Sequence, residues 1–162
     1  MLSILLPVYN CNCVALVTEL QRQCTECGTD FEIIVADDCS SVASYIEHNL
    51  RIERLDGVRY ITRKHNVGRS AIRNFLISQA QGEWLLFIDG DLTLDNPHFI
   101  RRYLQTKSNV VVGGIRIGGD PDRWKNNLRY RYEKAYEQKN TPQDRQCHAT
   151  KHFRTTNFLA HK

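Results

Sequence analysis

The sequence contains no apolar run that approaches the roughly 18 residues a membrane-spanning helix needs, and its mean hydropathy is -0.47. The chain opens with MLSILLPVYN, which has neither the basic region nor the small-residue cleavage site of a secretory signal peptide. Proline is scarce, with 4 residues, and the sequence has no Pro/Gly-rich linker, internal repeat or low-complexity tract. We therefore expect a globular protein located in the cytoplasm.

A length of 162 residues suits one domain with at most a small appended subdomain. Hydrophobic residues make up 41% and charged residues 25%, a balance that argues against a disordered or fibrous chain. The charge is uneven, because residues 1–120 contain 12 Lys and Arg against 14 Asp and Glu, whereas residues 121–162 contain 10 against 4. We therefore expect two parts, an α/β core over 1–120 and a basic segment over 121–162.

The chain has six cysteines, and without a signal peptide we expect reduced thiols rather than a disulfide framework. Cys24 and Cys27 form a single CxxC pair, whereas a structural zinc site needs a second pair of ligands at suitable spacing. Other possible ligands have no spacing that fixes their geometry, namely Cys11, Cys13, His148 and His152. We expect no metal at the CxxC pair.

Short apolar runs alternate with helical apolar periodicity along the chain. Strands are expected over residues 3–8, 31–36, 58–62, 84–88 and 109–117. Helices are expected over residues 14–22, 42–50, 67–81, 97–105 and 122–138. Strands that are apolar along their whole length belong in a sheet that is covered on both faces. The predicted fold class is therefore α/β, with a Rossmann-like, mostly parallel central sheet and helices on both faces.

Carboxylates follow two of the expected strands, and in open α/β sheets ligands bind beyond the carboxyl ends of the strands. Asp37 and Asp38 follow the second expected strand, and Asp89 and Asp91 follow the fourth. We therefore expect four carboxylates at one edge of the sheet. Because like charges held together repel each other, a cation or a ligand with hydrogen-bond donors is expected among them.

The sequence Asp89-Gly90-Asp91 is the strongest chemical signal in the chain. Two carboxylates on either side of a glycine can reach one hard cation. Mg²⁺ or Mn²⁺ prefers such oxygen ligands and is typically shared with substrate phosphates. The alternative is a turn in which Asp and Gly act only as turn formers.

Two further segments have a chemical and a purely structural interpretation. Asp37 or Asp38 could accept a hydrogen bond from a base or a ribose, or could cap the helix that follows. Asn66 is the expected N-cap of the third helix, and a helix N-terminus attracts phosphate. Arg69 in the first turn of that helix could pair with a diphosphate, and Arg73 could do so too or lie on a solvated face.

Five short segments together carry a family resemblance. They are PVYN at 7–10, DDCS at 37–40, NVGRSAIRN at 66–74, GEW at 82–84 and DGD at 89–91. In this order they resemble the family 2 glycosyltransferases, which have the GT-A fold. The resemblance covers roughly residues 2–116 and continues loosely to FRTTNF at 153–158, where such enzymes carry an acceptor-side Asn.

The resemblance implies a metal-dependent enzyme that transfers a sugar from a nucleoside-diphosphate sugar to a hydroxyl acceptor, with inversion. The implied roles are Pro7, Tyr9 and Asp38 at the nucleoside with Asp37 nearby, Arg69 near the base or diphosphate, Asp89 at the ribose or the metal's shell, and Asp91 on Mg²⁺ or Mn²⁺. Residues 1–120 would bind the donor, and 121–162 would lie on the acceptor side. A saccharide or another hydroxyl compound is the expected acceptor, with peripheral membrane association if that acceptor is lipid-linked.

The general base of this family is a carboxylate downstream of the Asn segment, but no Asp or Glu follows Asp144. We therefore expect the base beyond Lys162, in a longer protein. A nucleotidyltransferase is an alternative, although it should carry a Gly-rich, Arg-containing loop where this chain has PVYNCN. A nucleic-acid-binding module is another, but Tyr132 and Tyr136 have the spacing of a helix packing face, and we expect no nucleic acid partner.

Overall fold

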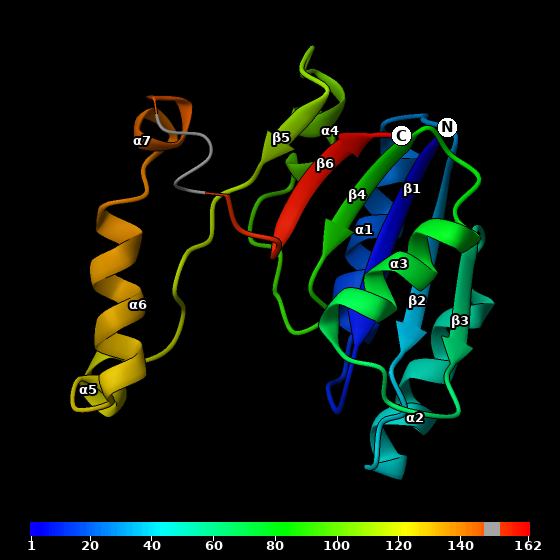
Figure 1. Ribbon diagram of the computed structural model, residues 1–162, viewed down its shortest axis with the longest axis horizontal. Helices are drawn as coiled ribbons and strands as arrows, with labels where there is room; N and C mark the ends of the chain where they lie inside the picture. Colours follow the sequence, from blue (N-terminus) through cyan, green and yellow to red (C-terminus); the bar gives the residue numbers. More distant parts are fainter. Residues whose placement is uncertain (148–152) are drawn as a thin grey trace. The chain divides into compact units, whose positions relative to one another are not determined.

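A six-stranded sheet in the order β3-β2-β1-β4-β6-β5 forms the centre of the computed structural model, which describes residues 1–147 and 153–162 (Figure 1). The strands are β1 Leu2–Val8, β2 Phe31–Asp37, β3 Val58–Thr62, β4 Trp84–Ile88, β5 Val110–Val112 and β6 Asn157–His161. β1 pairs in parallel with β2 and β4, and β2 pairs in parallel with β3. β6 pairs antiparallel with β4, and the predicted, mostly parallel sheet is confirmed.

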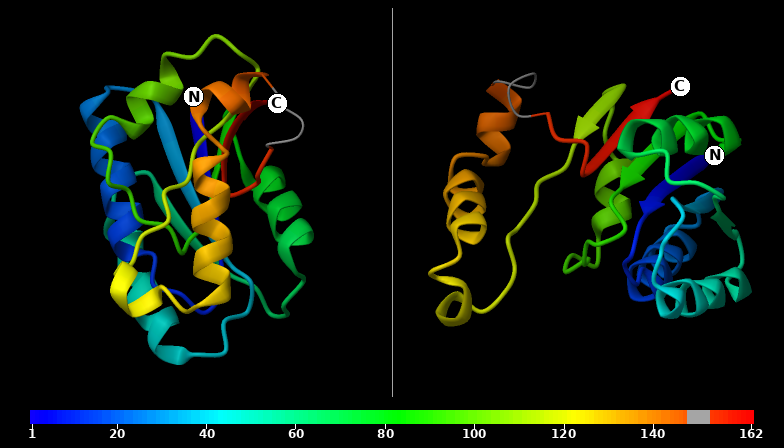
Figure 2. Two further views of the ribbon diagram at one scale, coloured as in Figure 1. Left: turned by 90° about the vertical axis from the view of Figure 1, so that its left-hand side faces the viewer. Right: turned by 60° about the horizontal axis from the view of Figure 1, so that its bottom comes forward.

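Helices between residues 14 and 104 cover both faces of this sheet, as Figure 2 shows from a second direction. The helices of the described residues are α1 Val14–Glu26, α2 Ala43–Asn49, the 3-10 helix η1 Leu50–Arg54, α3 Arg69–Gln79, α4 Phe99–Leu104, α5 Pro121–Trp124, α6 Leu128–Gln138 and α7 Pro142–Cys147. Alternate residues of β1 serve the two faces: Ile4 and Leu6 pack in one apolar cluster with α1 and α4, and Leu5 packs in the other with α3. This confirms the predicted α/β layers.

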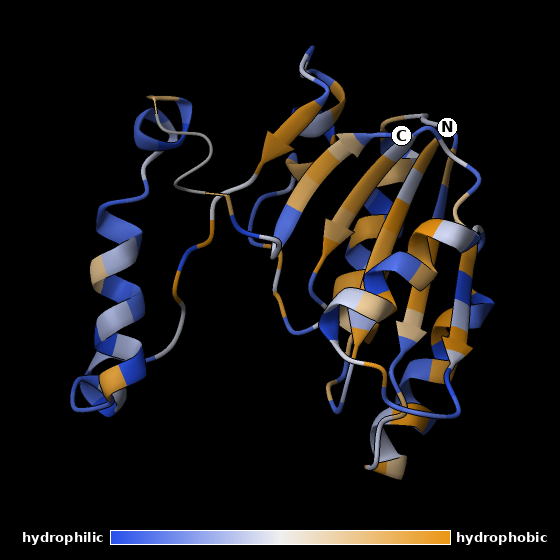
Figure 3. Cartoon of the chain, in the orientation of Figure 1, coloured by the Kyte–Doolittle hydropathy of each residue, from blue (hydrophilic) through white to orange (hydrophobic). Residues whose placement is uncertain are grey.

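The strands at the centre of the sheet are apolar along most of their length, which Figure 3 shows as orange ribbons. β4 is WLLFI, and its last four residues are buried. Across the sheet Phe87 stacks on Phe158 of β6, with ring centroids 4.7 Å apart. Because these strands are buried on both faces of the sheet, they lack the alternating polar residues of a strand with one solvent-exposed face.

Two expected elements differ most from the sequence pattern. The strand expected over 109–117 is only Val110–Val112. The helix expected over 122–138 is divided into α5 and α6, because the side chain of Asn127 accepts a hydrogen bond from the backbone N–H of Tyr130 and starts a new helix. No helix among residues 1–147 and 153–162 is long and apolar enough to cross a membrane.

The chain divides into two compact units. The first contains Met1–Val111 and Thr155–Lys162, and the second contains Val112–Arg154. The expected division at residue 120 differs from this, because the last residues of the chain return to the sheet as β6. Within the second unit, Arg154 pairs with Glu133 of α6 at 3.1 Å and lies over the ring of Tyr136. All residues discussed below as a candidate site belong to the first unit.

Candidate donor-nucleotide site at the carboxyl edge of the sheet

The parallel register brings the ends of three strands to one edge, the lower edge in Figure 1. Val8 of β1 is paired with Asp37 of β2, and the N–H of Asp38 donates to the carbonyl of Val8 at 2.8 Å. On the other side of β1, the N–H of Gly90 donates to the carbonyl of Pro7 at 3.3 Å. The structure therefore places Asp37, Asp38, Asp89 and Asp91 at the same edge of the sheet.

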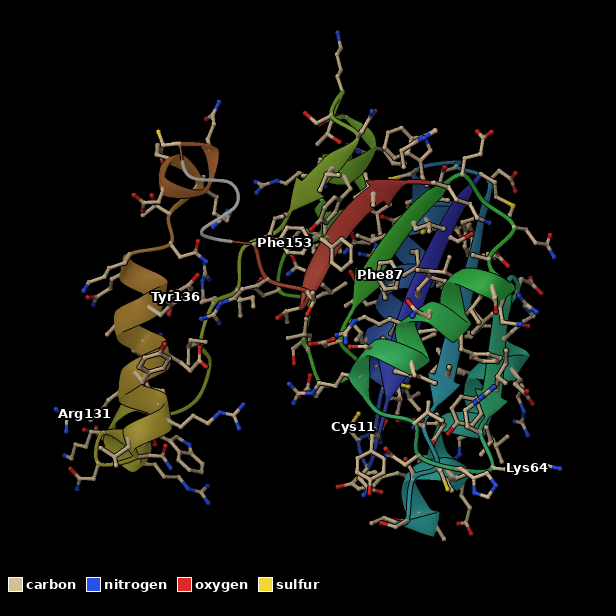
Figure 4. All side chains as sticks on the ribbon, in the orientation of Figure 1. Cys11, Lys64, Phe87, Arg131, Tyr136 and Phe153 are labelled. Carbon is tan, nitrogen blue, oxygen red and sulfur yellow. The ribbon has the colours of Figure 1, made fainter. Side chains whose placement is uncertain are left out.

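Cys11 lies just after the end of β1, at the same lower edge of the sheet (Figure 4). Burial raises the pKa of the Cys11 thiol, and the negative charges of Asp91, Asp37 and Asp89 raise it further. The thiol therefore stays protonated at neutral pH.

Asp37 is fully buried, and both of its carboxylate oxygens are occupied. Oδ1 accepts from the N–H of Ser40 at 2.6 Å, and Oδ2 accepts from the hydroxyl of Tyr60 at 2.6 Å. Burial and the bond to Asp37 raise the pKa of Tyr60 above its usual range. Asp37 therefore ties the end of β2 to its own turn and to β3, and its side chain is not presented to solvent.

Asp38 holds the segment that leads into α3. Its Oδ1 accepts from the N–H of Val67 and its Oδ2 from the N–H of Gly68, both at 2.9 Å. The prediction that Asn66 caps this helix is wrong, because the N-cap is Gly68, at φ 81°. A glycine adopts this left-handed conformation without strain, and a carboxylate distant in sequence bonds the N–H groups in front of the helix.

Arg73 is not on a solvated helix face. Its Nη2 lies 2.5 Å from Oδ1 of Asp89, and the side chain is 15% exposed. Nη2 is also 3.4 Å from the carbonyl of Thr155, in the segment that enters β6, and the next carbonyl, of Thr156, accepts from the N–H of Asp89. Burial raises the pKa of Asp89, against the lowering effect of Arg73. Arg73 thus joins α3, Asp89 and the start of β6.

Asp91 differs from the other three carboxylates because it is exposed. In the described part of the chain, no hydrogen bond or ion pair engages the side chain of Asp91. No group of three or more Cys, His, Asp or Glu among the described residues is arranged to hold a metal. His148 and His152, named above as possible ligands, lie outside the described residues. Between Asp89 and Asp91, Gly90 packs so closely on β1 that a Cβ would lie 2.6 Å from Cγ2 of Val8. The DGD turn is therefore anchored at its glycine, with Asp91 turned to solvent.

The other residues named from the sequence lie around this edge. Tyr9 is 52% exposed directly after β1, Pro7 is partly exposed, and Arg69 is exposed at the first position of α3. Asn157, in the expected acceptor-side segment, is paired with Ile88 across the sheet, and its Oδ1 accepts from the hydroxyl of Tyr103. The edge therefore combines exposed side chains with buried side chains whose hydrogen bonds hold the surrounding turns in place.

No role is expected from the sequence for Asn10 and Asn49, although both hold turns at this edge through their hydrogen bonds. Asn10 lies at φ 48° and bonds the turn after β2, and Asn49 is buried and bonds the turn after β1. The sequence offered one clue for Asn10. Asn10 is in the turn just after an apolar strand, and after Gly an Asn is the residue type that best tolerates a left-handed conformation.

Comparison with known proteins agrees with this geometry. The sequence model of the family described as Glycosyl transferase family 2 matches residues 3–161. An uncharacterized glycosyltransferase of Haemophilus influenzae is 34% identical over 93 residues, which are 56% of this chain and 29% of the relative. The poly(ribitol-phosphate) beta-glucosyltransferase of Bacillus spizizenii is 33% identical over 126 residues, 71% of this chain and 19% of the relative. The chain thus spans less than a third of the length of these two relatives.

Solved structures give the same result. Staphylococcus aureus TarS 1-349 in complex with UDP superposes with a TM-score of 0.58 and 26% identity, over 74% of this chain and 38% of that chain. The same protein in complex with UDP-GlcNAc gives a TM-score of 0.57 and 25% identity, over 74% of this chain and 36% of that chain. The fold is therefore the GT-A fold, and the chain belongs to glycosyltransferase family 2.

Proposed function

We propose that the carboxyl edge of β1, β2 and β4 binds the nucleoside diphosphate of a sugar donor, and that the protein transfers that sugar to a hydroxyl acceptor. One observation carries the proposal: Asp91, which is exposed and has no partner among the described residues, stands beside an Asp89 that Arg73 holds at 2.5 Å. A free carboxylate at this position can serve as an oxygen ligand for a hard cation. TarS, solved with UDP and with UDP-GlcNAc, supports a uridine nucleotide as the first candidate.

The proposed roles follow the exposure of each group. Exposed Tyr9 and partly exposed Pro7 form the rim for the nucleoside, next to the turn that Asp38 stabilises. Asp37 supports that turn from within the core. Arg69, exposed in the first turn of α3, is the cation available to a diphosphate. Because α3 begins beside it, the positive end of the helix dipole adds to this attraction.

Asp91, together with Asp89, is proposed to hold Mg²⁺ or Mn²⁺. Two carboxylates suit such hard cations, which take their remaining oxygen ligands from phosphate and water. When bound, the cation would neutralise the charge that develops on the departing diphosphate. Asp89 contributes from a fixed position, since Arg73 and the N–H bond to Thr156 restrain it.

The proposed reaction is a single displacement. A hydroxyl oxygen of the acceptor attacks the anomeric carbon, the bond from that carbon to the diphosphate oxygen breaks, and a base takes the hydroxyl proton. The chain itself supplies the groups that orient and stabilise the donor diphosphate. The base, the acceptor and the inverting outcome are proposed for the whole protein. The proposed acceptor is a saccharide or another hydroxyl compound, lipid-linked or free.

Calorimetry with the purified chain tests the donor site. UDP and UDP-GlcNAc are expected to bind, and Mn²⁺ is expected to tighten UDP binding by roughly ten-fold, or ~1.4 kcal/mol. UMP, which lacks the second phosphate, should gain less from the metal. If UDP, GDP and their sugars fail to bind at millimolar concentration with Mn²⁺ present, the proposed donor site is wrong.

A further inference from the structure

We propose that Asn10 is a positioning residue that locks the turns after β1 and β2 together and so sets the shape of the nucleoside pocket; this rests on the donor site proposed above. The residue lies in the turn after β1, between exposed Tyr9 and half-buried Cys11. Its partners are 30 to 32 residues away in sequence, in the turn after β2. It therefore links the two turns that flank the proposed nucleoside position.

Five hydrogen bonds make this link, the longest of which runs from the hydroxyl of Ser41 to Oδ1 of Asn10 at 3.4 Å. The backbone N–H of Asn10 donates to Oγ of Ser40 at 2.8 Å. Oδ1 of Asn10 accepts from the N–H of Ser41 at 2.9 Å and from the N–H of Val42 at 3.2 Å, while Nδ2 donates to Oγ of Ser41 at 3.1 Å. One amide side chain thus satisfies two backbone donors in front of α2, which has no cap from its own N-cap side chain.

Both turns are held in conformations that need such support. Asn10 is at φ 48° and Cys39 at φ 64°, the two non-glycine residues with positive φ among the described residues. Left-handed backbone at residues other than glycine is costly and persists only where surrounding contacts fix it. Asn tolerates this region better than most side chains, whereas Cys39 depends more on its neighbours.

A second asparagine fixes the first turn from its other side. Asn49 is fully buried at the end of α2, where its Oδ1 accepts from the N–H of Cys13 at 3.0 Å and its Nδ2 donates to the carbonyl of Cys11 at 2.9 Å. Asn49 can therefore hold the base of the turn when Asn10 is changed. The expected consequence of losing Asn10 is a mobile rim rather than an unfolded core.

The rim matters for binding because Tyr9 and Asp38 lie in or beside the two linked turns. When the turns are free to move, a nucleotide must order them on binding, and this loss of freedom weakens affinity. The effect falls on the nucleoside end of the donor. The DGD turn at the metal end has its own anchors, which are the packing of Gly90 on β1 and the pair between Arg73 and Asp89.

The test compares three variants at a temperature where circular dichroism shows all of them folded. Asn10→Gly keeps the positive φ but removes the side chain, and UMP and UDP affinity should each fall about ten-fold. Asn10→Asp keeps the acceptor oxygen and the tolerance for φ, and should restore most of the affinity. Asn126→Gly, in the exposed segment between α5 and α6, is the matched control and should bind as the parent chain does.

A second readout separates positioning from general loosening. The factor by which Mn²⁺ tightens UDP binding should be unchanged in Asn10→Gly, because only the nucleoside end is affected. Ser40→Ala, which removes one bond of the link, is the milder variant should the glycine variant not fold, and about a three-fold loss is expected. UDP affinity equal to the parent in a folded Asn10→Gly or Ser40→Ala overturns this inference alone, whereas no UDP binding by the parent overturns the donor site itself.

Discussion

Asp91→Asn is expected to abolish the metal-dependent part of nucleotide binding while leaving metal-free UDP binding nearly unchanged. A neutral amide is a much poorer ligand for a hard divalent cation than a carboxylate. Asp91 is exposed and unpaired in the described structure, so its replacement leaves no buried group without a partner. In calorimetry, the factor by which Mn²⁺ increases UDP affinity should fall from roughly ten to about one.

Asp56→Asn is the matched control for this change. Asp56 is also exposed and lies at the opposite, amino edge of the sheet, just before β3, so the variant removes the same charge from a distant place. It should retain the full effect of Mn²⁺. Asp89→Asn is expected to lose less than Asp91→Asn in the presence of metal. A full Mn²⁺ effect in Asp91→Asn would favour the interpretation of DGD as a turn only.

Asp37→Ala is expected to lower the free energy of unfolding by about 4 kcal/mol, since each buried donor left without a partner costs ~1–3 kcal/mol. The substitution strands the hydroxyl of Tyr60 and the N–H of Ser40 at a position with no solvent exposure. Urea unfolding followed by circular dichroism measures the change. A loss below about 1 kcal/mol would contradict the structural role given to Asp37.

A double-mutant cycle isolates the Asp37–Tyr60 contact. Tyr60→Phe removes the hydroxyl donor and should itself destabilise, because Oδ2 of Asp37 then loses its partner. With both changes present, the loss should be clearly smaller than the sum of the single losses, by about 1 kcal/mol or more. Asp37→Asn, which retains an acceptor oxygen, is the milder variant and should fall between the parent and Asp37→Ala. Strict additivity would show that the two side chains do not interact.

The elements that the sequence predicts best are those whose pattern is local. The apolar run of 3–8 is β1 Leu2–Val8, one residue longer than expected, because burial on both faces requires an unbroken apolar strand. β6, Asn157–His161, was not predicted. Its five residues become a strand through pairing with β4 and through the bond from the N–H of His161 to the carbonyl of Asn109, and such tertiary contacts leave little local signal.

The same distinction applies to the site. Topology places carboxylates that follow parallel strands at one edge, so their grouping could be predicted. The individual environments of these carboxylates could not be predicted, because their partners come from distant segments. Asp37 accepts from the hydroxyl of Tyr60 in β3, whereas Asp38 accepts from the backbone just before α3. Arg73 is a further case. Helical spacing alone left it between a ligand contact and a solvated face, whereas the structure pairs it with Asp89.

The most direct test of the donor site is paramagnetic broadening of backbone amide NMR signals by Mn²⁺, with UDP present and Mg²⁺ as the diamagnetic reference. The amides of Gly90, Asp91 and Cys11, at the carboxyl edge of the sheet, should broaden first. Those of Gly57 and Gly82, at the amino edge, should remain sharp. Asp91→Asn should remove the selective broadening. Broadening centred on any other part of the chain, or equal at both edges of the sheet, would contradict a donor site at the ends of β1, β2 and β4.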